Sequence, residues 1–249
     1  MRKKIAAGNW KMNLGYSDAK KLAEAVARFD SNADREIVLF PPFVYLELVK
    51  QVSSGTSVQV GAQNICDREN GAFTGEISAP MLRSMEIPYV LIGHSERRMY
   101  YHESHELLKE KLNVALKYEL RPMFCCGEPK EIRLAEKQES YVLKQLEESL
   151  FHLNADDFQR VIIAYEPVWA IGTGLTATPE EAQNMHHFIR TKIAFQYGDA
   201  VAMNTRILYG GSVNAGNAAT LFAQPDVDGG LVGGASLKAE EFEVICKAV

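Results

Sequence analysis

Short apolar runs alternate along the chain with longer stretches in which apolar residues recur every three or four positions. Within the short runs the apolar side chains follow one another without polar residues between them, which is typical of strands buried on both faces of a parallel sheet. Eight such runs predict strands: Ile5–Trp10, Ile37–Phe40, Val58–Gln63, Tyr89–Gly93, Pro122–Cys126, Val161–Glu166, Arg206–Tyr209 and Gly229–Val232. We therefore expect an α/β protein built on a parallel sheet.

The stretches between these runs have the period of amphipathic helices. Leu108, Leu112 and Ala115 are spaced i, i+4, i+7, and comparable spacings occur at 182–193 and 242–246. Ser and Thr side chains accept the free N–H groups of a first helical turn, which makes them preferred N-caps. The predicted N-caps are Ser17, Ser78, Ser104, Thr178 and Ser236.

Eight strand–helix units in 249 residues match the number and length of a (β/α)8 barrel. No linker rich in Pro, Gly or Ser interrupts the pattern, so we expect a single domain over residues 1–249. A doubly wound open sheet is the alternative, but no Gly-x-Gly-x-x-Gly follows the first predicted strand.

Composition and charge narrow the possible partners. A hydrophobic content of 47% with 24% charged residues is ordinary for a soluble globular protein. The net charge of −5 gives no reason to expect nucleic acid or an anionic membrane as a partner. No apolar run approaches the ~20 residues that a membrane span needs. A small anionic substrate would instead need a local positive site.

The sequence gives little support for a metal site or a disulfide. The four cysteines are Cys66, Cys125, Cys126 and Cys246, which form neither a disulfide framework nor a zinc pattern. His102 and His105 lack a third ligand nearby, so we expect no metal. Behind the basic start of the chain, Ile5–Ala7 is too short for the apolar core of a signal peptide. We expect a reduced, cytoplasmic protein.

The stretch that begins at the end of the sixth predicted strand contains the strongest candidates for catalysis. Glu166 ends this strand, and a carboxylate there lies at the mouth of a barrel, where such folds build their sites. The loop that follows is apolar, although loops normally face water. A stiff Pro and two Gly flank this loop, which indicates a lid over a bound ligand. The lid residues are Pro167, Val168, Trp169, Ala170, Ile171, Gly172, Thr173 and Gly174.

Polar and small residues also follow the other strands. Small residues after the seventh and eighth strands, Gly210–Asn214 and Gly233–Ser236, let backbone N–H groups approach an anion at a helix start. Such loops often hold phosphate in barrels, although glycines also simply permit tight turns. Lys11 follows the first strand and is either a cation of the site or a solvated surface lysine.

His94 follows the fourth strand and precedes a short predicted helix. At a helix N-terminus the dipole disfavours imidazolium, so we expect a neutral ring that donates a hydrogen bond. The alternative is a buried histidine with a structural role. Glu166 is either a general base or a carboxylate paired with a nearby Lys or Arg.

Together these groups suit the abstraction of a proton beside the carbonyl of a small phosphorylated substrate. Glu166 would be the base, while Lys11 and His94 would stabilise the oxyanion, so neither a metal nor another cofactor is required. Two alternative functions are also compatible with these residues. One is a Schiff-base aldolase with Lys11 as nucleophile, and the other is a binding protein without turnover.

At these residues the chain resembles the triosephosphate isomerase family over essentially its whole length. The segments that carry the resemblance are Gly8–Asn13, Gly61–Asn64, Gly71–Ser78, Gly93–Arg98, Tyr165–Gly174, Tyr209–Val213 and Gly229–Leu237. The resemblance implies a TIM barrel that interconverts dihydroxyacetone phosphate and glyceraldehyde 3-phosphate in glycolysis and gluconeogenesis, without a cofactor.

The resemblance also implies roles for single residues. Glu166 matches the base of the family, His94 its neutral electrophile, and Glu96 an acid that positions the groups beside it. Asn9 and Lys11 match residues that contact the substrate. The matched phosphate site comprises Asn9, Lys11, Gly172, Ser212, Gly233 and Gly234.

The family forms homodimers, which implies that Gly71–Glu76, with Thr74 at its tip, reaches the site of a second copy. Two departures stand out. Leu175 replaces the usual Lys at the end of the lid, and Cys126 replaces a residue such as Ile. Neither lies at a matched catalytic position, but Leu175 leaves the kinetics of the lid open.

Overall fold

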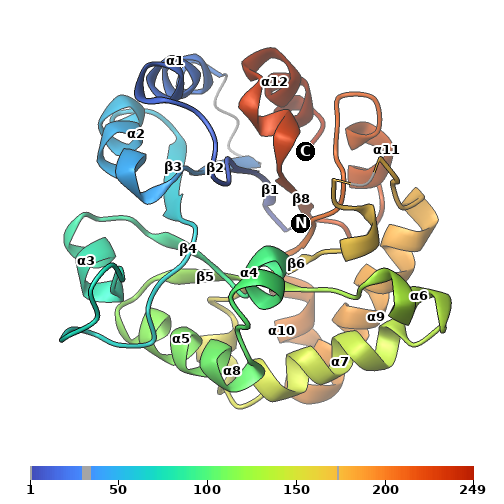
Figure 1. Cartoon of the computed structure of the whole chain (residues 1–249). Helices are drawn as coiled ribbons and strands as arrows, with labels where there is room; N and C mark the ends of the chain where they lie inside the picture. The colour runs from blue at the N-terminus through green and yellow to red at the C-terminus, as the bar shows by residue number, and fades with distance from the viewer. Residues whose placement is uncertain (1, 30–34, 173) are drawn as a thin grey trace.

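Eight parallel strands close into a barrel in the order β1 to β8, and the helices surround it (Figure 1). The computed structural model describes residues 2–29, 35–172 and 174–249. Each strand pairs with its neighbours in sequence, and β1 pairs with β8 to close the ring. This closure confirms the predicted (β/α)8 fold and excludes the doubly wound open sheet.

All eight predicted strands are present, and their ends differ from the prediction by at most two residues. The strands are β1 Lys4–Asn9, β2 Arg35–Phe40, β3 Val58–Ala62, β4 Tyr89–Ile92, β5 Arg121–Cys126, β6 Ile162–Tyr165, β7 Ile207–Tyr209 and β8 Gly229–Val232. Because the strands are parallel, their carboxyl ends meet at one edge of the barrel, and the loops after them surround one opening.

The helices follow the strands as predicted. The α-helices are α1 Tyr16–Val26, α2 Leu46–Ser53, α3 Ala79–Ser84, α4 Ser95–Tyr100, α5 His105–Lys117, α6 Lys130–Leu134, α7 Gln138–Ser149, α8 Ala155–Phe158, α9 Pro179–Tyr197, α10 Asp199–Asn204, α11 Ala218–Phe222 and α12 Ala239–Lys247. Three short 3-10 turns are η1 Phe43–Tyr45, η2 Val168–Ala170 and η3 Gly234–Leu237. In the part of the chain that the structure describes, no helix is both long and apolar enough to span a bilayer.

Three of the five predicted N-caps are confirmed. The side chains of Ser78, Ser104 and Thr178 each accept the N–H of the residue three positions on. Ser17 and Ser236 were wrong. Helix α1 already begins at Tyr16, with Gly15 in the extended cap conformation, so Ser17 lies inside the first turn. Ser236 lies within η3, where its hydroxyl donates to a backbone carbonyl rather than capping α12.

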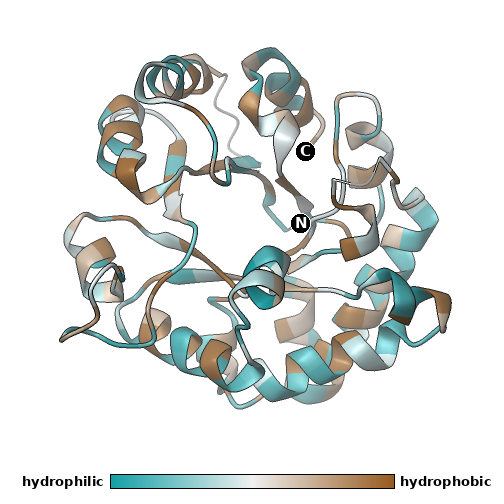
Figure 2. Ribbon diagram, viewed as in Figure 1, coloured by the Kyte–Doolittle hydropathy of each residue, from teal (hydrophilic) through white to brown (hydrophobic). Residues whose placement is uncertain are grey.

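The core has two layers because strand side chains alternate between the two faces of the sheet. One set fills the barrel interior: Ile5, Ala7, Val38, Phe40, Tyr89, Leu91, Met123, Cys125, Ile162, Ala164, Leu208 and Leu231. The alternate strand residues point outward and pack beneath the apolar faces of the helices. Figure 2 shows brown apolar positions and teal polar positions distributed along the same helices. Burial on both faces explains why the strand sequences lack polar alternation.

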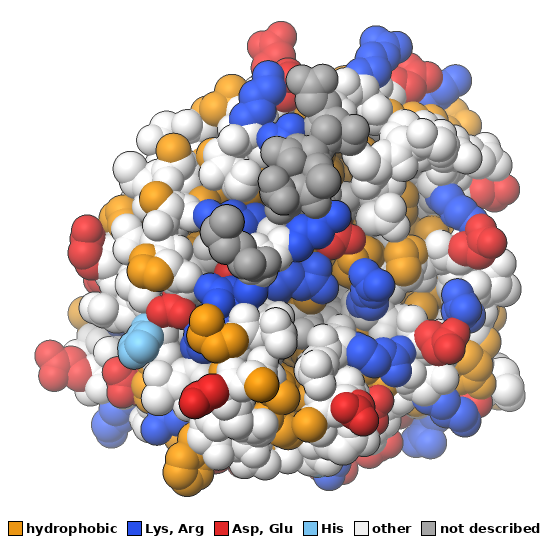
Figure 3. All heavy atoms as spheres, turned by 180° about the vertical axis from the view of Figure 1, so that it is seen from behind, with side chains coloured by type: hydrophobic (Ala, Val, Ile, Leu, Met, Phe, Trp, Pro, Cys, Tyr) orange, Lys and Arg blue, Asp and Glu red, His pale blue; other side chains and the backbone are white. Residues whose placement is uncertain are grey.

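Charged side chains gather at the amino ends of the strands. Arg206 pairs with Glu36 at 3.1 Å, and Arg2 pairs with Asp228 at 2.6 Å. Figure 3 looks at the face opposite to that of Figure 1 and shows Lys and Arg side chains near its middle. These pairs stabilise the edge of the barrel at the amino ends of the strands. Barrels build their functional sites at the opposite edge, from the loops after the strands.

Candidate active site

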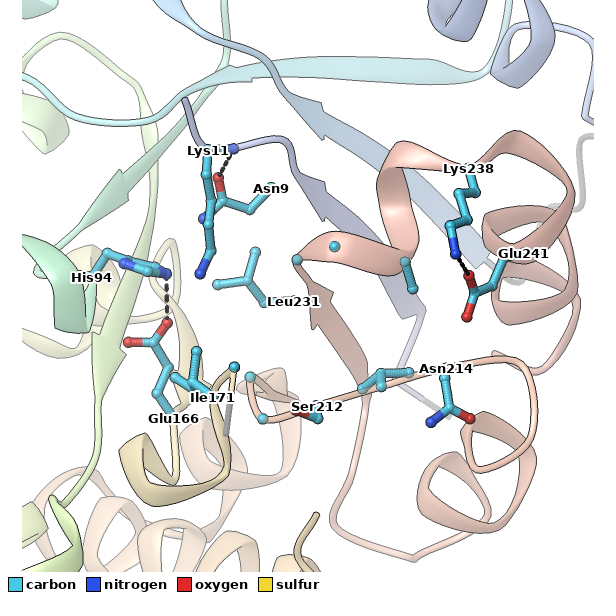
Figure 4. A pocket seen from close by; sticks show the side chains of 17 residues that line it. Asn9, Lys11, His94, Glu166, Ile171, Ser212, Asn214, Leu231, Lys238 and Glu241 are labelled. Atoms are coloured by element: carbon cyan, nitrogen blue, oxygen red, sulfur yellow. Dashed lines mark hydrogen bonds and ion pairs between the residues drawn. The ribbon is translucent and has the colours of Figure 1, made fainter. Parts of the chain in front are cut away.

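A pocket of about 390 Å³ opens at the carboxyl ends of the strands (Figure 4). Most of the predicted site residues line it: Asn9, Lys11, His94, Glu166, Gly172, Ser212, Gly233 and Gly234. Glu96 is not part of the lining and instead contacts Lys11 from beside the pocket. The structure therefore brings together residues that come from the ends of five strands and from the lid segment.

Glu166 is the first residue after β6 and is 2% exposed. Its Oε2 accepts the backbone N–H of Ser95 at 2.9 Å, and its Oε1 lies 3.1 Å from Nε2 of His94. Within the described ranges, no Lys or Arg nitrogen lies within ion-pair distance of this carboxylate. The alternative of a carboxylate neutralised by a basic side chain is therefore not realised there.

Two glycines leave room for this carboxylate. A Cβ atom built on Gly210 would lie 2.8 Å from Cγ of Glu166. A Cβ atom on Gly127 would lie 1.7 Å from the carbonyl oxygen of the same residue. Any side chain at these two positions would displace the backbone or the carboxylate of Glu166, since real Cβ contacts are not this short.

His94 is the N-cap of α4, as the sequence indicated. Its Nδ1 accepts the N–H of Glu96 at 3.3 Å, so the proton of the neutral ring lies on Nε2. Nε2 faces Oε1 of Glu166 inside the pocket. The ring is thus buried but directed at the reacting space, and its tautomer is the one that donates into the pocket.

The loop after β1 holds Lys11 in an unusual backbone conformation. Lys11 has φ 51, a left-handed value that costs a residue with a side chain on the order of 1 kcal/mol. Asn9 Oδ1 accepts the Lys11 N–H at 3.0 Å, and Gln63 Nε2 donates to the Lys11 carbonyl at 2.9 Å. Contacts on both sides of the residue therefore fix its position.

The Lys11 ammonium lies between an acid and the phosphate-binding loops predicted from the sequence. Its Nζ donates to Glu96 Oε1 at 2.6 Å. A Cβ atom built on Gly233 would lie 3.5 Å from Cε of Lys11, so the lysine stem passes over this glycine. A Schiff-base nucleophile needs a neutral amine, whereas Lys11 is placed as an ammonium donor. This arrangement disfavours the aldolase reading.

The lid segment is in contact with the predicted phosphate site. The backbone N–H and the hydroxyl of Ser212 both donate to the carbonyl of Ala170, at 3.1 and 2.6 Å. Gly172 and Gly174 have φ 68 and 79, left-handed values that favour glycine. Thr173, also predicted as part of the lid, lies outside the described residues. Both donors of Ser212 would have to leave the Ala170 carbonyl before they could bind an anion.

Glu128 anchors the start of the lid. It is fully buried, accepts the indole N–H of Trp169 at 2.8 Å and accepts the hydroxyl of Tyr165 at 3.0 Å. Burial raises the pKa of the Glu128 carboxyl, and the indole and phenol hydrogen bonds oppose that rise. The guanidinium of Arg133 lies 5.5 Å from the centre of the Trp169 ring.

Sequence reasoning missed four contacts that hold the site together. It gave no role to Gln63, Ser95 or Glu128, and it placed Gly210 in the predicted phosphate loop without its contact to Glu166. Each of the four lies within two residues of a strand end or directly follows a predicted site residue. These places at the strand ends were the signal from which the sequence could have identified these residues. Burial raises the pKa of the thiols of Cys125 and Cys126, in keeping with buried strand cysteines. Among the described residues, no group of three or more His, Cys, Asp or Glu side chains is arranged around a metal position.

Comparisons with known proteins agree with this geometry. The sequence model of the family described as "Triosephosphate isomerase" matches residues 4–249. A curated triosephosphate isomerase of Phocaeicola vulgatus is 53% identical over 252 residues, covering 100% of this chain and 99% of that protein. Those of Cytophaga hutchinsonii and Flavobacterium psychrophilum are 50% and 44% identical, with full coverage of both chains in each case. With the barrel, the pocket and these matches in agreement, the chain belongs to the triosephosphate isomerase family.

Proposed function

We propose that Glu166 is the base in the reaction of this family, the interconversion of dihydroxyacetone phosphate and glyceraldehyde 3-phosphate. The observation that carries the proposal is a carboxylate that is 2% exposed, faces the pocket and lies 3.1 Å from a ring nitrogen of His94. Among the described residues no Lys or Arg pairs with this carboxylate, so it is available to accept a proton from a bound substrate.

The proposed reaction balances without an added oxidant or reductant. Glu166 takes the proton from the carbon beside the carbonyl, and the electron pair moves onto the carbonyl oxygen to give an enediolate. The Nε2–H of His94 and the ammonium of Lys11 stabilise that oxyanion. The hydroxyl proton on the first carbon's oxygen passes to the former carbonyl oxygen, and Glu166 returns the abstracted proton to the former carbonyl carbon, so the carbonyl group forms on the first carbon. General-base catalysis contributes about 10²–10⁴ in rate.

Glu166 must change its partners for this reaction. In the structure its Oε2 accepts the Ser95 N–H, which holds the carboxylate beside α4. A carboxylate that removes a proton needs a free oxygen within about 3 Å of that proton. We infer that Glu166 gives up the Ser95 contact when substrate enters.

The substrate phosphate would bind among the backbone N–H groups near Gly172, Ser212, Gly233 and Gly234, with Lys11 beside them. Asn9 supports this site through its contact with the Lys11 backbone, and Glu96 supports it through its bond with the Lys11 ammonium. When the lid residues close over the bound phosphate, they exclude water from the enediolate.

We also propose that the active form is a cytoplasmic homodimer. The loops after the first four strands carry exposed apolar side chains, among them Met12 at 94%, Val44 at 80% and Phe73 at 46%. These strands are neighbours in the barrel, so the side chains lie along one side of its opening. Water-exposed apolar groups of this size favour burial against a second copy, with Thr74 at the tip of the contacting loop.

An isomerase assay coupled to removal of the product tests the proposal. Wild-type protein should interconvert the two triose phosphates, and Glu166→Gln should lower kcat at least about 10²-fold with little change in KM. Glu139→Gln, at an exposed position on α7, is the matched control and should retain full activity. Near-normal turnover by the Glu166 variant would mean that another group is the base.

A further inference from the structure

The active-site pocket extends beyond the residues that the proposed reaction uses. At the end opposite to His94 and Glu166 it is lined by Lys238 and Glu241 (Figure 4). Lys238 follows η3, the turn that begins at Gly234, so it belongs to the segment that forms the predicted phosphate site. The resemblance to the family gave this lysine no role.

The charges around the pocket make a second cation important. The chain has a net charge of −5, so its overall field does not attract a dianion. The charged residues that line the pocket are two lysines and two glutamates, and the ring of His94 accepts the Glu96 N–H at Nδ1, a contact that fits an uncharged ring. Lys11 is already hydrogen-bonded to Glu96 at 2.6 Å. The pocket therefore lacks a surplus of positive charge before substrate arrives.

Lys238 differs from Lys11 in how it is held. Its Nζ lies 3.6 Å from Oε2 of Glu241, which is too long for a hydrogen bond. Its side chain is 76% exposed, and exposed ion pairs of this kind hold their partners weakly. Its backbone, in contrast, is fixed, since its carbonyl accepts the N–H of Phe242 at 2.9 Å. The Lys238 ammonium is therefore exposed and weakly paired at the pocket entrance, while its backbone is held by a hydrogen bond.

We propose that Lys238 is the entrance cation that recruits the phosphate dianion of the substrate, and that Glu241 opposes it. Lys238 acts on the arrival and binding of the anion, not on proton transfer, because it lies at the far end of the pocket from Glu166. Glu241 draws the ammonium aside and repels the incoming phosphate. This inference rests on the proposed function of the pocket and adds a residue that governs its preference for anionic substrates.

The proposal predicts opposite effects for the two partners. At low ionic strength, Lys238→Met should lower kcat/KM about three- to tenfold, mainly through KM, with kcat within about twofold of wild type. Glu241→Gln should raise kcat/KM under the same conditions. Added salt should reduce kcat/KM of the wild type more steeply than that of Lys238→Met, because salt screens the attraction that the lysine supplies.

The control removes the same charge from the other end of α12, since Lys238 is the N-cap residue of this helix and Lys247 is its last residue. Lys247 pairs with Glu243 near the end of α12 and does not line the pocket. Lys247→Met should therefore leave kcat/KM and its salt dependence unchanged. Thermal unfolding of each variant checks that the fold is retained, which is expected because both lysine side chains are more than half exposed.

The outcomes separate this proposal from the function on which it rests. Absence of isomerase activity in the wild-type protein would overturn the proposed function. With an active wild type, the role of Lys238 would be overturned if Lys238→Met matched Lys247→Met, or if its loss lay in kcat with KM unchanged. A fall in kcat/KM for Glu241→Gln would overturn the opposing role of Glu241.

Discussion

At the scale of single residues, a backbone N–H group and the free space beside a glycine hold the Glu166 side chain in position. Ser95 contributes only a backbone N–H to its carboxylate, and Gly210 leaves space beside its Cγ. The residue types at these two positions are common in turns, so the sequence did not reveal that they adjoin Glu166. Their importance comes from tertiary placement against a side chain far away in sequence.

Gly210→Ala should lower kcat at least about tenfold while the protein stays folded. The new methyl group would lie 2.8 Å from Cγ of Glu166 and would push the carboxylate away from its working position. Misplacement of a catalytic group by about 1 Å costs up to roughly 10² in rate. Steady-state kinetics with a circular dichroism spectrum measures both effects.

The matched control for this substitution is Gly15→Ala. A Cβ atom at Gly15 meets nothing within 4 Å, and the residue has φ −88, which Ala adopts freely. Activity of Gly15→Ala should equal that of the wild type. Equal activities for wild type, Gly15→Ala and Gly210→Ala would show that the space beside Glu166 does not constrain the base.

At the scale of elements, the ends of the strands were the most predictable feature of the site. Asn9 ends β1, Glu166 directly follows β6, and His94 is the second residue after β4. The apolar runs located those strand ends to within two residues. The helix starts were harder. Thr178 forms a reciprocal capping box with Glu181, whereas the isolated Ser17 and Ser236 lack such support and do not cap a helix.

Helix α9 is attached to the barrel through a buried histidine. His186 is 0% exposed and packs edge-on against the ring of Tyr165. Its Nδ1 lies 3.3 Å from the backbone carbonyl of Asp226 and donates to it, as a neutral ring can. Burial lowers the pKa of His186 from 6.5 to about 4. The helix therefore packs against the barrel with this histidine uncharged.

Acid should weaken the fold through this residue. Because the pKa of His186 is depressed in the folded state, the unfolded chain binds more protons as the pH falls from 6.5 toward 4. Its contribution to stability is complete above about pH 6.5 and is lost toward about pH 4, a change of about 3 kcal/mol. Asp226, whose pKa is lowered below 3.8, adds its loss only at more acidic pH.

Urea unfolding at pH 7 and at pH 4.5, with one fixed protein concentration, measures this loss. His186→Gln should lose about 2–3 kcal/mol less than the wild type between the two pH values. His102→Gln, at an exposed position, should behave as the wild type does. An identical pH dependence in the wild type and in His186→Gln would mean that the pKa of His186 is the same in the folded and unfolded protein, contrary to this account.

At the scale of the whole molecule, the barrel brings residues that are far apart in the sequence into one pocket. The residues of the site are spread from Asn9 to Gly234, and closure of β1 onto β8 brings the first and last of them together. The sequence predicted this architecture because continuous apolar runs mark the strands, whereas apolar residues at every third or fourth position mark the helices. It did not predict the contacts across the pocket, such as the Lys11–Glu96 bond, since these depend on side-chain directions between separate loops.

The protein should sediment at twice the mass of the chain at micromolar concentration. Phe73→Glu should shift this equilibrium toward monomers and reduce activity, because it places a charge in the apolar loop proposed to contact the second copy. Phe195→Glu is the control, since Phe195 is 90% exposed but lies on α9. A wild-type protein that is monomeric and fully active would contradict the proposed dimer.

The most direct test of the central claim follows hydrogen on carbon. Triose phosphate incubated with the protein in heavy water should gain deuterium at the carbon beside the carbonyl, because Glu166 exchanges the abstracted proton with solvent before returning it. The Glu166→Gln variant should show this exchange at least about 10²-fold more slowly. If the wild-type protein left that carbon free of deuterium while substrate and product interconverted, or caused no interconversion at all, the proposed proton abstraction by Glu166 would be contradicted.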